Sequence, residues 1–435
     1  MKAATDAATP ADTPSLPAAA RVFGRIGILS FGGPAAQIAL MHREIVDERR
    51  WLSERQYLDA LAFCMLLPGP EAMQLATYSG WRLHGTAGGL VAGLLFVLPG
   101  AAVVLALAVL YAALGEVPLV AALFLGVKAA VSVVVIEALI RVARRALAEP
   151  FHWLIAALSF ILIFFFAVPF PLIVALAGLA GLLRGGAAPA VHQTTRAEAA
   201  APKAGLAGTL RTVAIWLAVW WLPLIAVGIL GADTILPTIG LFFSKLAIVT
   251  FGGAYAVLAY MAQDVVGHYG WLGAGEMMDG LGLAETTPGP LILVTEFVGF
   301  LAGWHAGGIG LGLAAAAVTL WATFAPCFLW IFAGAPYVER IAAAPRLRGA
   351  LSAITAAVVG VILNLAVWFG LHVFFTEVAV ARYGPLVLQE PELASLDPRV
   401  VVIAVLAAFL LIGRHWGVAR VLALSAALGA ASMLT

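Results

Sequence analysis

Long apolar runs constrain this chain more than any other feature of its sequence. Several of them reach about 20 residues, the length that a helix needs to cross ~30 Å of hydrocarbon. The 435 residues are 63% hydrophobic and only 11% charged, and the apolar runs continue almost to the C-terminus. This composition is typical of an integral membrane protein rather than a soluble one. We therefore expect an all-α polytopic membrane protein.

A Pro-Gly-Pro triplet interrupts one apolar run at residues 68–70 and occurs again at residues 288–290. When the two triplets are superimposed, 23–70 aligns with 243–290 without a gap, and 16 of the 48 aligned positions are identical. The identities include Phe-Gly-Gly, Trp-Leu and Pro-Gly-Pro at fixed separations. Chance matching in apolar sequence does not produce such a set, so the sequence predicts two homologous halves.

The domain boundaries follow from composition. The first residues are Ala, Pro and Thr without the apolar core of a signal peptide. Pro, Gly and basic residues interrupt the apolar runs again between the two halves. We expect four segments, namely a disordered tail over 1–20, a first repeat over 21–183, a cytoplasmic linker over 184–210 and a second repeat over 211–435.

Basic residues predict opposite orientations for the two halves. Residues 43–55 hold four Arg, whereas residues 246–339 of the second half hold no Lys or Arg. Further along, the pattern reverses, because the turn at 115–118 has no base and its approximate partner at 340–348 has three Arg. Cytoplasmic loops carry the excess of Lys and Arg, so this exchange predicts inverted-topology repeats.

The number of membrane spans follows from the apolar runs. Five of them read as full crossings, namely 87–112, 118–140, 211–231, 307–335 and 350–375. Two further runs, 151–183 and 399–434, are interrupted and read as pairs of short helices.

The Pro-Gly-Pro and Phe-Gly-Gly motifs predict broken or re-entrant helices. Proline lacks an amide donor and clashes with the preceding helical turn. In a bilayer, the freed backbone groups must be buried in protein or line an aqueous cavity. Interrupted helices at matching positions of two inverted halves indicate a transport site near the midplane, where helix N-termini suit an anion. The alternative is that these prolines are kinks that only allow the bundle to pack.

Several side chains beside the breaks are candidates for substrate binding. Arg25 and Lys245 occupy equivalent positions before each Phe-Gly-Gly and are candidate counter-charges, although each could also be a snorkelling side chain. Hydroxyl groups directly precede the breaks and are candidate donors to an oxyanion, although such groups often bond their own helix carbonyls. These hydroxyls belong to Ser30, Thr250, Thr286 and Thr287.

Three carboxyl groups flank the breaks within apolar sequence. Glu71, Glu285 and Glu296 are candidates for proton coupling or for ion pairs with the basic residues. Asp59 and Asp279 match across the two halves, and we favour a structural pairing role for them over substrate contact.

The sequence contains none of the motifs of a hydrolase, an ATP-driven pump or a nicotinamide enzyme. Cys64 and Cys327 stand alone, with no ligand spacing around them. We therefore expect no enzymatic activity, no cofactor, no metal site and no nucleic-acid partner.

Five motifs together resemble the chromate ion transporter family in its long two-domain form. They are Phe31-Gly-Gly-Pro, LLPGPEAMQLATY at 66–78, FVLPG at 96–100, FGGAY at 251–255 and ETTPGPLILVTEFVGF at 285–300. The resemblance covers both halves. The family's signature positions fall at Gly32, Gly33, Pro34, Pro68, Gly69, Pro70, Gly252, Gly253, Pro288, Gly289 and Pro290. Ala254 replaces the second proline of the Phe-Gly-Gly-Pro motif, which predicts that the halves contribute unequally.

The resemblance implies export of chromate, a tetrahedral dianion, across a bacterial inner membrane, driven by a membrane gradient rather than by ATP. It makes chromate, sulfate and the lipid bilayer the expected partners and implies chromate resistance. We place the N-terminus in the cytoplasm. A homodimer, a sulfate or other oxyanion carrier, and a membrane enzyme or assembly factor remain as alternatives.

Overall fold

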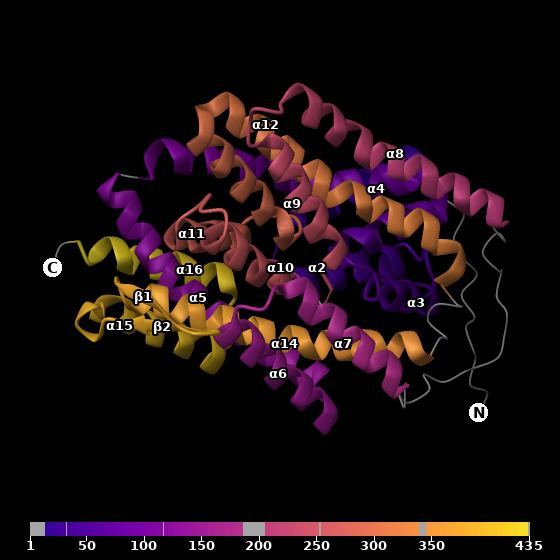
Figure 1. Ribbon diagram of the computed structural model, residues 1–435. Helices are drawn as coiled ribbons and strands as arrows, with labels where there is room; N and C mark the ends of the chain where they lie inside the picture. Colours follow the sequence, from indigo (N-terminus) through magenta and orange to yellow (C-terminus); the bar gives the residue numbers. More distant parts are fainter. Residues whose placement is uncertain are drawn as a thin grey trace, which may run out of the picture.

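The computed structural model describes residues 14–31, 33–115, 117–185, 205–251, 254–338 and 345–433. Nearly all of this part of the chain is helical, and five of its helices are long and apolar enough to cross a membrane (Figure 1). The predicted all-α polytopic fold is confirmed. Some predicted features lie outside the described residues, namely Gly32, Gly252, Gly253, residues 1–13 of the tail and residues 186–204 of the linker.

The first half of the chain forms a series of helices that are interrupted at the predicted breaks. They are α1 (Leu16–Leu29), α2 (Gly33–His42), the π-helix η1 (Arg43–Glu48), α3 (Glu54–Cys64), α4 (Glu71–Leu114), α5 (Pro118–Ala146), α6 (Pro150–Phe166) and α7 (Phe170–Arg184).

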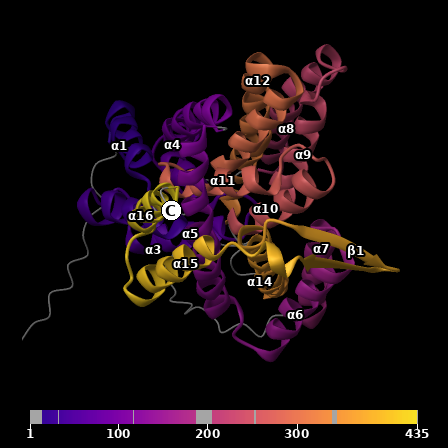
Figure 2. The ribbon, with the colours of Figure 1, turned by 90° about the vertical axis from the view of Figure 1, so that its left-hand side faces the viewer.

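The second half repeats this order. Its elements are α9 (Leu236–Val249), α10 (Ala254–Met261), η2 (Ala262–Val266), α11 (Ala274–Thr286), η3 (Leu291–Leu293), α12 (Val294–Gly334), η4 (Ala335–Tyr337), α14 (Pro345–Phe374), η5 (Leu393–Ser395), α15 (Pro398–Ala408), η6 (Phe409–Gly413) and α16 (Val418–Ala431). The alignment of the two halves matches both ends of α9 to those of α1, and even the π-helical segments recur. Figure 2 shows α1 and α4 on one side of the molecule and α9 and α12 on the other.

One helix stands between the two series. α8 (Leu206–Leu230) precedes α9 and has no counterpart before α1 among the described residues. It packs on α12 and α9 at the outside of the molecule, and only 6% of the residues in its most apolar stretch are buried. The match between the halves thus begins at Leu236, whereas the second repeat was predicted to begin at residue 211.

The helical segments begin closer to the predicted tail and linker than expected. α1 already begins at Leu16, so residues 16–20 are helical and do not belong to a disordered tail. Pro17 lies in its first turn, where the missing amide hydrogen of proline costs nothing. α8 likewise begins at Leu206, inside the predicted linker.

The two longest helices each fold back on themselves. The backbone is non-helical at His84 and Gly85 in α4, and again at Gly307 and Gly308 in α12. Gly80 lies so close to the Gly88 carbonyl that an added Cβ would come within 2.3 Å of it. Eight residues of a straight helix span about 12 Å, so this contact requires a hairpin. The part of each helix after the fold, its second arm, provides a predicted crossing. The runs 151–183 and 399–434 are pairs of helices, as predicted.

The halves exchange their last helices. α5 of the first half packs on α15 and α16, whereas its counterpart α14 packs on α6 and α7, as Figure 1 shows. Glycines allow both approaches, because a Cβ on Gly126 would lie 1.8 Å from the Ser425 carbonyl oxygen and one on Gly181 would lie 2.3 Å from that of Gly349. α5 and α14 also contact each other, so the two halves form one interlocked body.

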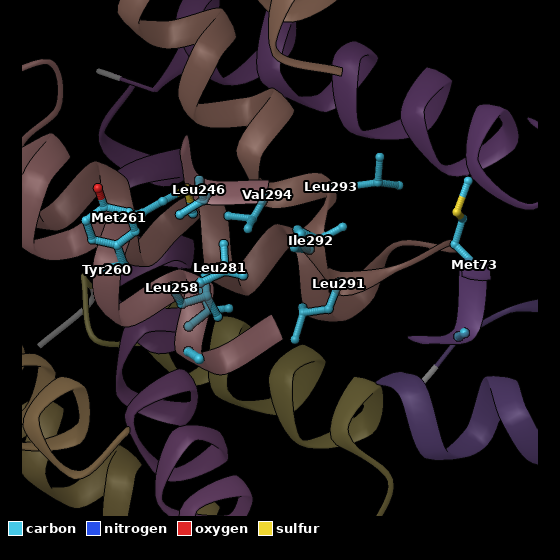
Figure 3. Close-up of a cluster of buried hydrophobic side chains, with 14 of the residues drawn as sticks. Met73, Leu246, Leu258, Tyr260, Met261, Leu281, Leu291, Ile292, Leu293 and Val294 are labelled. Carbon is cyan, nitrogen blue, oxygen red and sulfur yellow. The ribbon is translucent and has the colours of Figure 1, made fainter. Parts of the chain in front are cut away.

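The main apolar core extends through most of the described helices, and Figure 3 shows the part of it beside the second Pro-Gly-Pro break. The first residues after that break, Leu291 to Val294, are buried among side chains of α9, α10 and α11. Met73 of α4 reaches the same cluster from the first half. The second break is therefore held by apolar packing that involves both halves.

A short β-hairpin connects α14 to α15 and was not predicted. Its strands β1 (Val378–Tyr383) and β2 (Leu386–Pro391) pair antiparallel around Gly384, which has a positive φ of 62°. Figure 2 shows the hairpin projecting away from the helices, and most of its side chains are exposed or half-buried.

Candidate functional site

Each Pro-Gly-Pro triplet connects a short entering helix to a long one. α3 ends at Cys64 and α4 begins at Glu71, directly after the first triplet. Gly69 has φ +113° and Gly289 has φ +91°, a region that favours glycine. The triplets are therefore tips of re-entrant segments, as the broken-helix interpretation expects.

The entering helices α3 and α11 begin in the same way. Ser53 and Gln56 form a capping box, in which the Gln56 amide donates to Ser53 Oγ at 3.2 Å and the Ser53 amide donates to Gln56 Oε1 at 3.1 Å. In the second half, the Gly273 amide donates to Glu276 Oε2 at 2.8 Å. These caps hold the first turn of each entering helix.

Backbone hydrogen bonds connect the four breaks reciprocally. The Gly69 amide donates to the Thr250 carbonyl at 2.9 Å, and the Gly289 amide donates to the Ser30 carbonyl at 2.9 Å. Ser30 and Thr250 directly precede the two Phe-Gly-Gly motifs. The Pro-Gly-Pro tip of each half therefore rests on the Phe-Gly-Gly break of the other half.

A small closed pocket lies where these breaks meet. Its walls include a residue from the first turn of four helical segments, namely Pro34 of α2, Glu71 of α4, Ala254 of α10 and Leu291 of η3. Gly69, Thr250 and Gln37 also line the pocket. The first amides of a helix have no intrahelical acceptor and carry its positive dipole end. Pro34 has no amide hydrogen, but the free amide ends at Glu71, Ala254 and Leu291 make a field around the pocket that suits an anion.

Two glutamines that sequence reasoning missed hold the tips. Gln37 Nε2 donates to the Gly289 carbonyl at 2.6 Å, and Gln74 Nε2 donates to the Pro68 carbonyl at 2.7 Å. Both side chains are at most 1% exposed, and among the described residues neither Oε1 atom has a hydrogen-bond partner. An uncharged amide in an apolar half-helix is the signal that could have identified them.

The four candidate hydroxyl groups donate to carbonyls of their own helices. Ser30 Oγ donates to Ile26 at 2.6 Å, and Thr250 Oγ1 donates to Leu246 at 2.5 Å. Thr286 and Thr287 bond their own helix in the same way. These bonds match the alternative role, in which each hydroxyl group bonds a carbonyl of its own helix. An oxyanion can receive a hydrogen bond from these hydroxyl groups only if they rotate.

The two basic candidates each face an acid on the segment after the neighbouring Phe-Gly-Gly break. Arg25 Nη1 lies 3.8 Å from Glu44 Oε1, and its side chain is 59% exposed while that of Glu44 is 1% exposed. Lys245 acts electrostatically on Asp264 and lies over the ring of Tyr260 at 5.5 Å. The alignment of the two halves matches Glu44 with Asp264, so both pairs occupy equivalent positions.

The three carboxyl candidates have different surroundings. Glu71 lines the central pocket. Glu285 Oε1 accepts a hydrogen bond of 2.6 Å from Tyr255, and the charge of Arg141 acts on the same carboxylate. Glu296 is buried in the first arm of α12, and within the described part of the chain its Oε2 has no hydrogen-bond partner.

The matched aspartates differ in the two halves. Asp59 pairs with Arg55 at 3.8 Å, and both side chains are 57% exposed. Asp279 is 3% exposed and pairs at 3.3 Å with Lys128 of α5. Sequence reasoning assigned no role to Lys128.

The fold and the site define a polytopic membrane transporter whose pocket is built from interrupted helices. The chain belongs to the chromate transporter family, whose pattern matches residues 18–182 and 237–430. These two segments contain the two series of helices, and α8 lies between them. The predicted resemblance to the long two-domain form is confirmed.

Three relatives illustrate the similarity. The chain is 36% identical to the chromate transport protein of Pseudomonas aeruginosa over 367 residues, which cover 82% of each chain. It is 30% identical to the chromate transport protein of Cupriavidus metallidurans over 365 residues, 79% of this chain and 80% of the relative. It is 29% identical to the probable chromate transport protein of Synechococcus elongatus over 366 residues, 82% of this chain and 85% of the relative. No solved structure matches the chain.

Proposed function

We propose that this protein exports chromate from the cytoplasm across a bacterial inner membrane and thereby confers chromate resistance. The observation that carries the proposal is the pocket at the crossing of the four breaks, with a helical N-terminus from each break in its wall. The family relationship supports chromate as the substrate.

The closed pocket indicates how transport works. Its volume of about 10 Å³ holds about one water molecule, so a tetrahedral oxyanion does not fit into it. The bonds that close it, Gly69 to Thr250 and Gly289 to Ser30, each join one half to the other. We infer that the Pro-Gly-Pro tips move away from the Phe-Gly-Gly breaks to admit the anion, with one pair of breaks opening toward each side in turn.

Glu71 gives this pocket a means of proton coupling. Its carboxyl group competes with a bound dianion for the same positive helix ends, because like charges in one small site repel each other. Protonation of Glu71 removes that repulsion and favours anion binding. Glu285 and Glu296 are the other two candidates for carrying a proton.

The membrane potential is a sufficient driving force. An inside-negative potential favours exit of each negative charge by roughly 2.3 kcal/mol per 100 mV. A dianion can therefore leave the cell without ATP. If protonation of Glu71 is coupled to transport, a proton gradient modifies this driving force.

Transport into everted membrane vesicles tests the proposal. Vesicles that contain the protein are expected to accumulate labelled chromate when energised, and empty-vector vesicles provide the baseline. Equal accumulation of labelled sulfate would favour the general oxyanion carrier. Absence of energy-dependent chromate accumulation would exclude chromate export.

The Glu71→Gln variant tests the coupling in the same vesicles. It is expected to keep chromate accumulation driven by a potassium diffusion potential and to lose the response to an imposed pH gradient. An unchanged response to the pH gradient would remove Glu71 from the coupling route.

A further inference from the structure

The structure contains a buried ion pair at the contact between the two halves that the proposed function does not use. Lys128 of α5 lies 3.3 Å from Asp279 Oδ2 of α11, and Tyr111 of α4 donates to the same oxygen at 2.8 Å. The cation and the hydroxyl come from the first half of the chain, and the carboxylate comes from the second half.

Lys128 lies deep in a membrane-spanning helix. It follows Pro118, the first residue of α5, by ten residues, which places it ~15 Å along the helix axis. The midpoint of this 29-residue helix is only ~6 Å further on. An ionisable side chain at this depth is costly and suggests a functional role.

The surroundings differ for the two partners. The Asp279 side chain is 4% exposed, whereas that of Lys128 is 25% exposed, so the carboxylate is the more deeply buried partner. Among the described residues, Asp279 Oδ1 has no hydrogen-bond partner although it is buried. The carboxylate is therefore held through one oxygen only.

The equivalent aspartate in the other half pairs with a different residue, Arg55 of its own helix, and does not share these features. Asp59 and Arg55 face the outside, both being 57% exposed. No Lys or Arg occurs between Arg348 and the end of α14, the counterpart of α5. In the described part of the chain, the buried pair therefore occurs in only one of the two related halves. If the repeated fold needed such a pair for its stability, both halves would be expected to have one.

The helix that carries Asp279 also leads to the second Pro-Gly-Pro break. α11 carries Asp279 and continues inward to Thr286, two residues before the second Pro-Gly-Pro triplet. At 1.5 Å per residue, Asp279 lies ~14 Å from Pro288 along the helix. Between Asp279 and the end of α11, this helix packs closely on α5, because a Cβ on Gly282 would come within 2.3 Å of Val127 Cγ1.

We propose that Lys128 is a second anion-binding residue, which receives the tetrahedral oxyanion between the central pocket and the membrane side where α5 begins. In the resting protein Asp279 neutralises Lys128. When the oxyanion arrives it takes the place of Asp279 beside the ammonium group, and Tyr111 continues to donate to the carboxylate. When the oxyanion leaves, Asp279 pairs with Lys128 again, so the lysine is never left as an unpaired charge in the membrane.

This inference rests on the proposed anion transport and adds a binding step to it. Its chemistry predicts opposite effects for the two partners. Removing the lysine charge weakens binding of the oxyanion, whereas removing the aspartate charge leaves the lysine free and strengthens it.

The test measures the dependence of initial transport rate on chromate concentration in everted vesicles. Lys128→Met is expected to raise the half-saturating chromate concentration at least about tenfold, since it removes a close charge partner. Asp279→Asn is expected to lower that concentration and also the maximal rate, because the oxyanion is released more slowly. The matched control, Arg55→Gln with Asp59→Asn, removes the exposed pair and is expected to leave both quantities unchanged.

The double variant Lys128→Met/Asp279→Asn separates binding from stability. It leaves no uncompensated charge in the core, so it avoids the folding defect that one lone partner can cause. It is expected to insert normally and to keep the raised half-saturating concentration. Wild-type kinetics in the double variant, or an unchanged half-saturating concentration in Lys128→Met, would show that the pair is structural only. Failure of the wild-type protein to transport chromate would instead overturn the proposed function.

Discussion

The amide of Gly69 donates a hydrogen bond to the carbonyl of Thr250, which lies in the other half of the chain. Its counterpart joins Gly289 to Ser30 at the same distance of 2.9 Å. Together the two bonds fix each Pro-Gly-Pro tip on the opposite Phe-Gly-Gly break. Any movement that opens the pocket between them must therefore break or shift one of these bonds.

Replacing either tip glycine by alanine is expected to destabilise the closed pocket. Gly69 and Gly289 have positive φ, and a Cβ on Gly69 would lie 3.0 Å from both Cys327 Sγ and Gln74 Nε2. Strain of this kind costs of order 1–3 kcal/mol. Gly69→Ala and Gly289→Ala should therefore lower the melting temperature of the purified protein and slow chromate transport.

Gly310→Ala is the control for these two variants. Gly310 lies in the second arm of α12 and has open space where a Cβ would be added, so alanine there is expected to maintain or raise stability. If all three variants lowered the melting temperature equally, backbone strain at the tips would not be the cause.

Removal of either basic candidate beside the Phe-Gly-Gly breaks is expected to abolish chromate resistance. Arg25→Ala and Lys245→Ala should still insert into the membrane at normal levels, as immunoblotting of membrane fractions would check. The pairing of Arg25 with Glu44 adds a control, because Arg25→Ala/Glu44→Ala removes both charges. If the double variant regains resistance, Arg25 serves only as the counter-ion of Glu44 and leaves the list of binding residues.

Much of the fold could be predicted because its main features repeat along the sequence. The alignment of the two halves identified the breaks, and the apolar runs identified the crossings that α5, α8 and α14 provide. The exchange of the last helices could not be predicted, since it depends on the close approach of small residues such as Gly126 to the backbone of α16. An apolar run does not indicate which neighbour it packs against.

The candidate site was predictable where both halves carry it. The two Pro-Gly-Pro tips make equivalent contacts with the two Phe-Gly-Gly breaks, and the alignment of the two halves had already matched these motifs. Lys128, Gln37 and Gln74 were missed because none of them has a chemical equivalent in the other half. The partners of Arg25 and Lys245 were accessible in principle, because Glu44 and Asp264 are also matched by the alignment of the two halves.

Protonated His42 is expected to stabilise the segment that leads into the first re-entrant tip. Its Nε2 lies 2.6 Å from Glu54 Oε2, and its Nδ1 lies 3.2 Å from Asp47 Oδ2. Burial lowers the pKa of His42, but the hydrogen bonds and charges of Glu54 and Asp47 outweigh burial and hold the pKa above its usual value of 6.5. The stabilisation is therefore complete below that value and is lost as the pH rises through the raised pKa.

Melting temperatures of wild type and His42→Asn should therefore differ most below pH 6.5 and converge as the pH rises above the raised pKa of His42. Because both acids are more than half exposed, the difference should be at most ~1 kcal/mol, or a few degrees. His415→Asn is the control for loss of an imidazole, and the positive φ of 54° at His415 is a conformation that asparagine adopts readily. A difference for His42→Asn that stayed constant with pH would indicate lost packing rather than lost charge.

The two entering helices α3 and α11 are expected to start from opposite sides of the membrane. Arginines flank the start of α3 in the sequence, whereas residues 246–339, which contain α11, hold no Lys or Arg, and basic loop residues stay on the cytoplasmic side. α8 lies between the two series of helices and has no counterpart among the described residues of the first series. One extra crossing at this place reverses the orientation of the second series relative to the first. Accessibility tags inserted after Arg55 and near Gly275 should therefore be labelled from the cytoplasmic and the outer side, respectively. Labelling of both tags from one side would exclude the inverted arrangement, and with it the alternating opening of the two breaks.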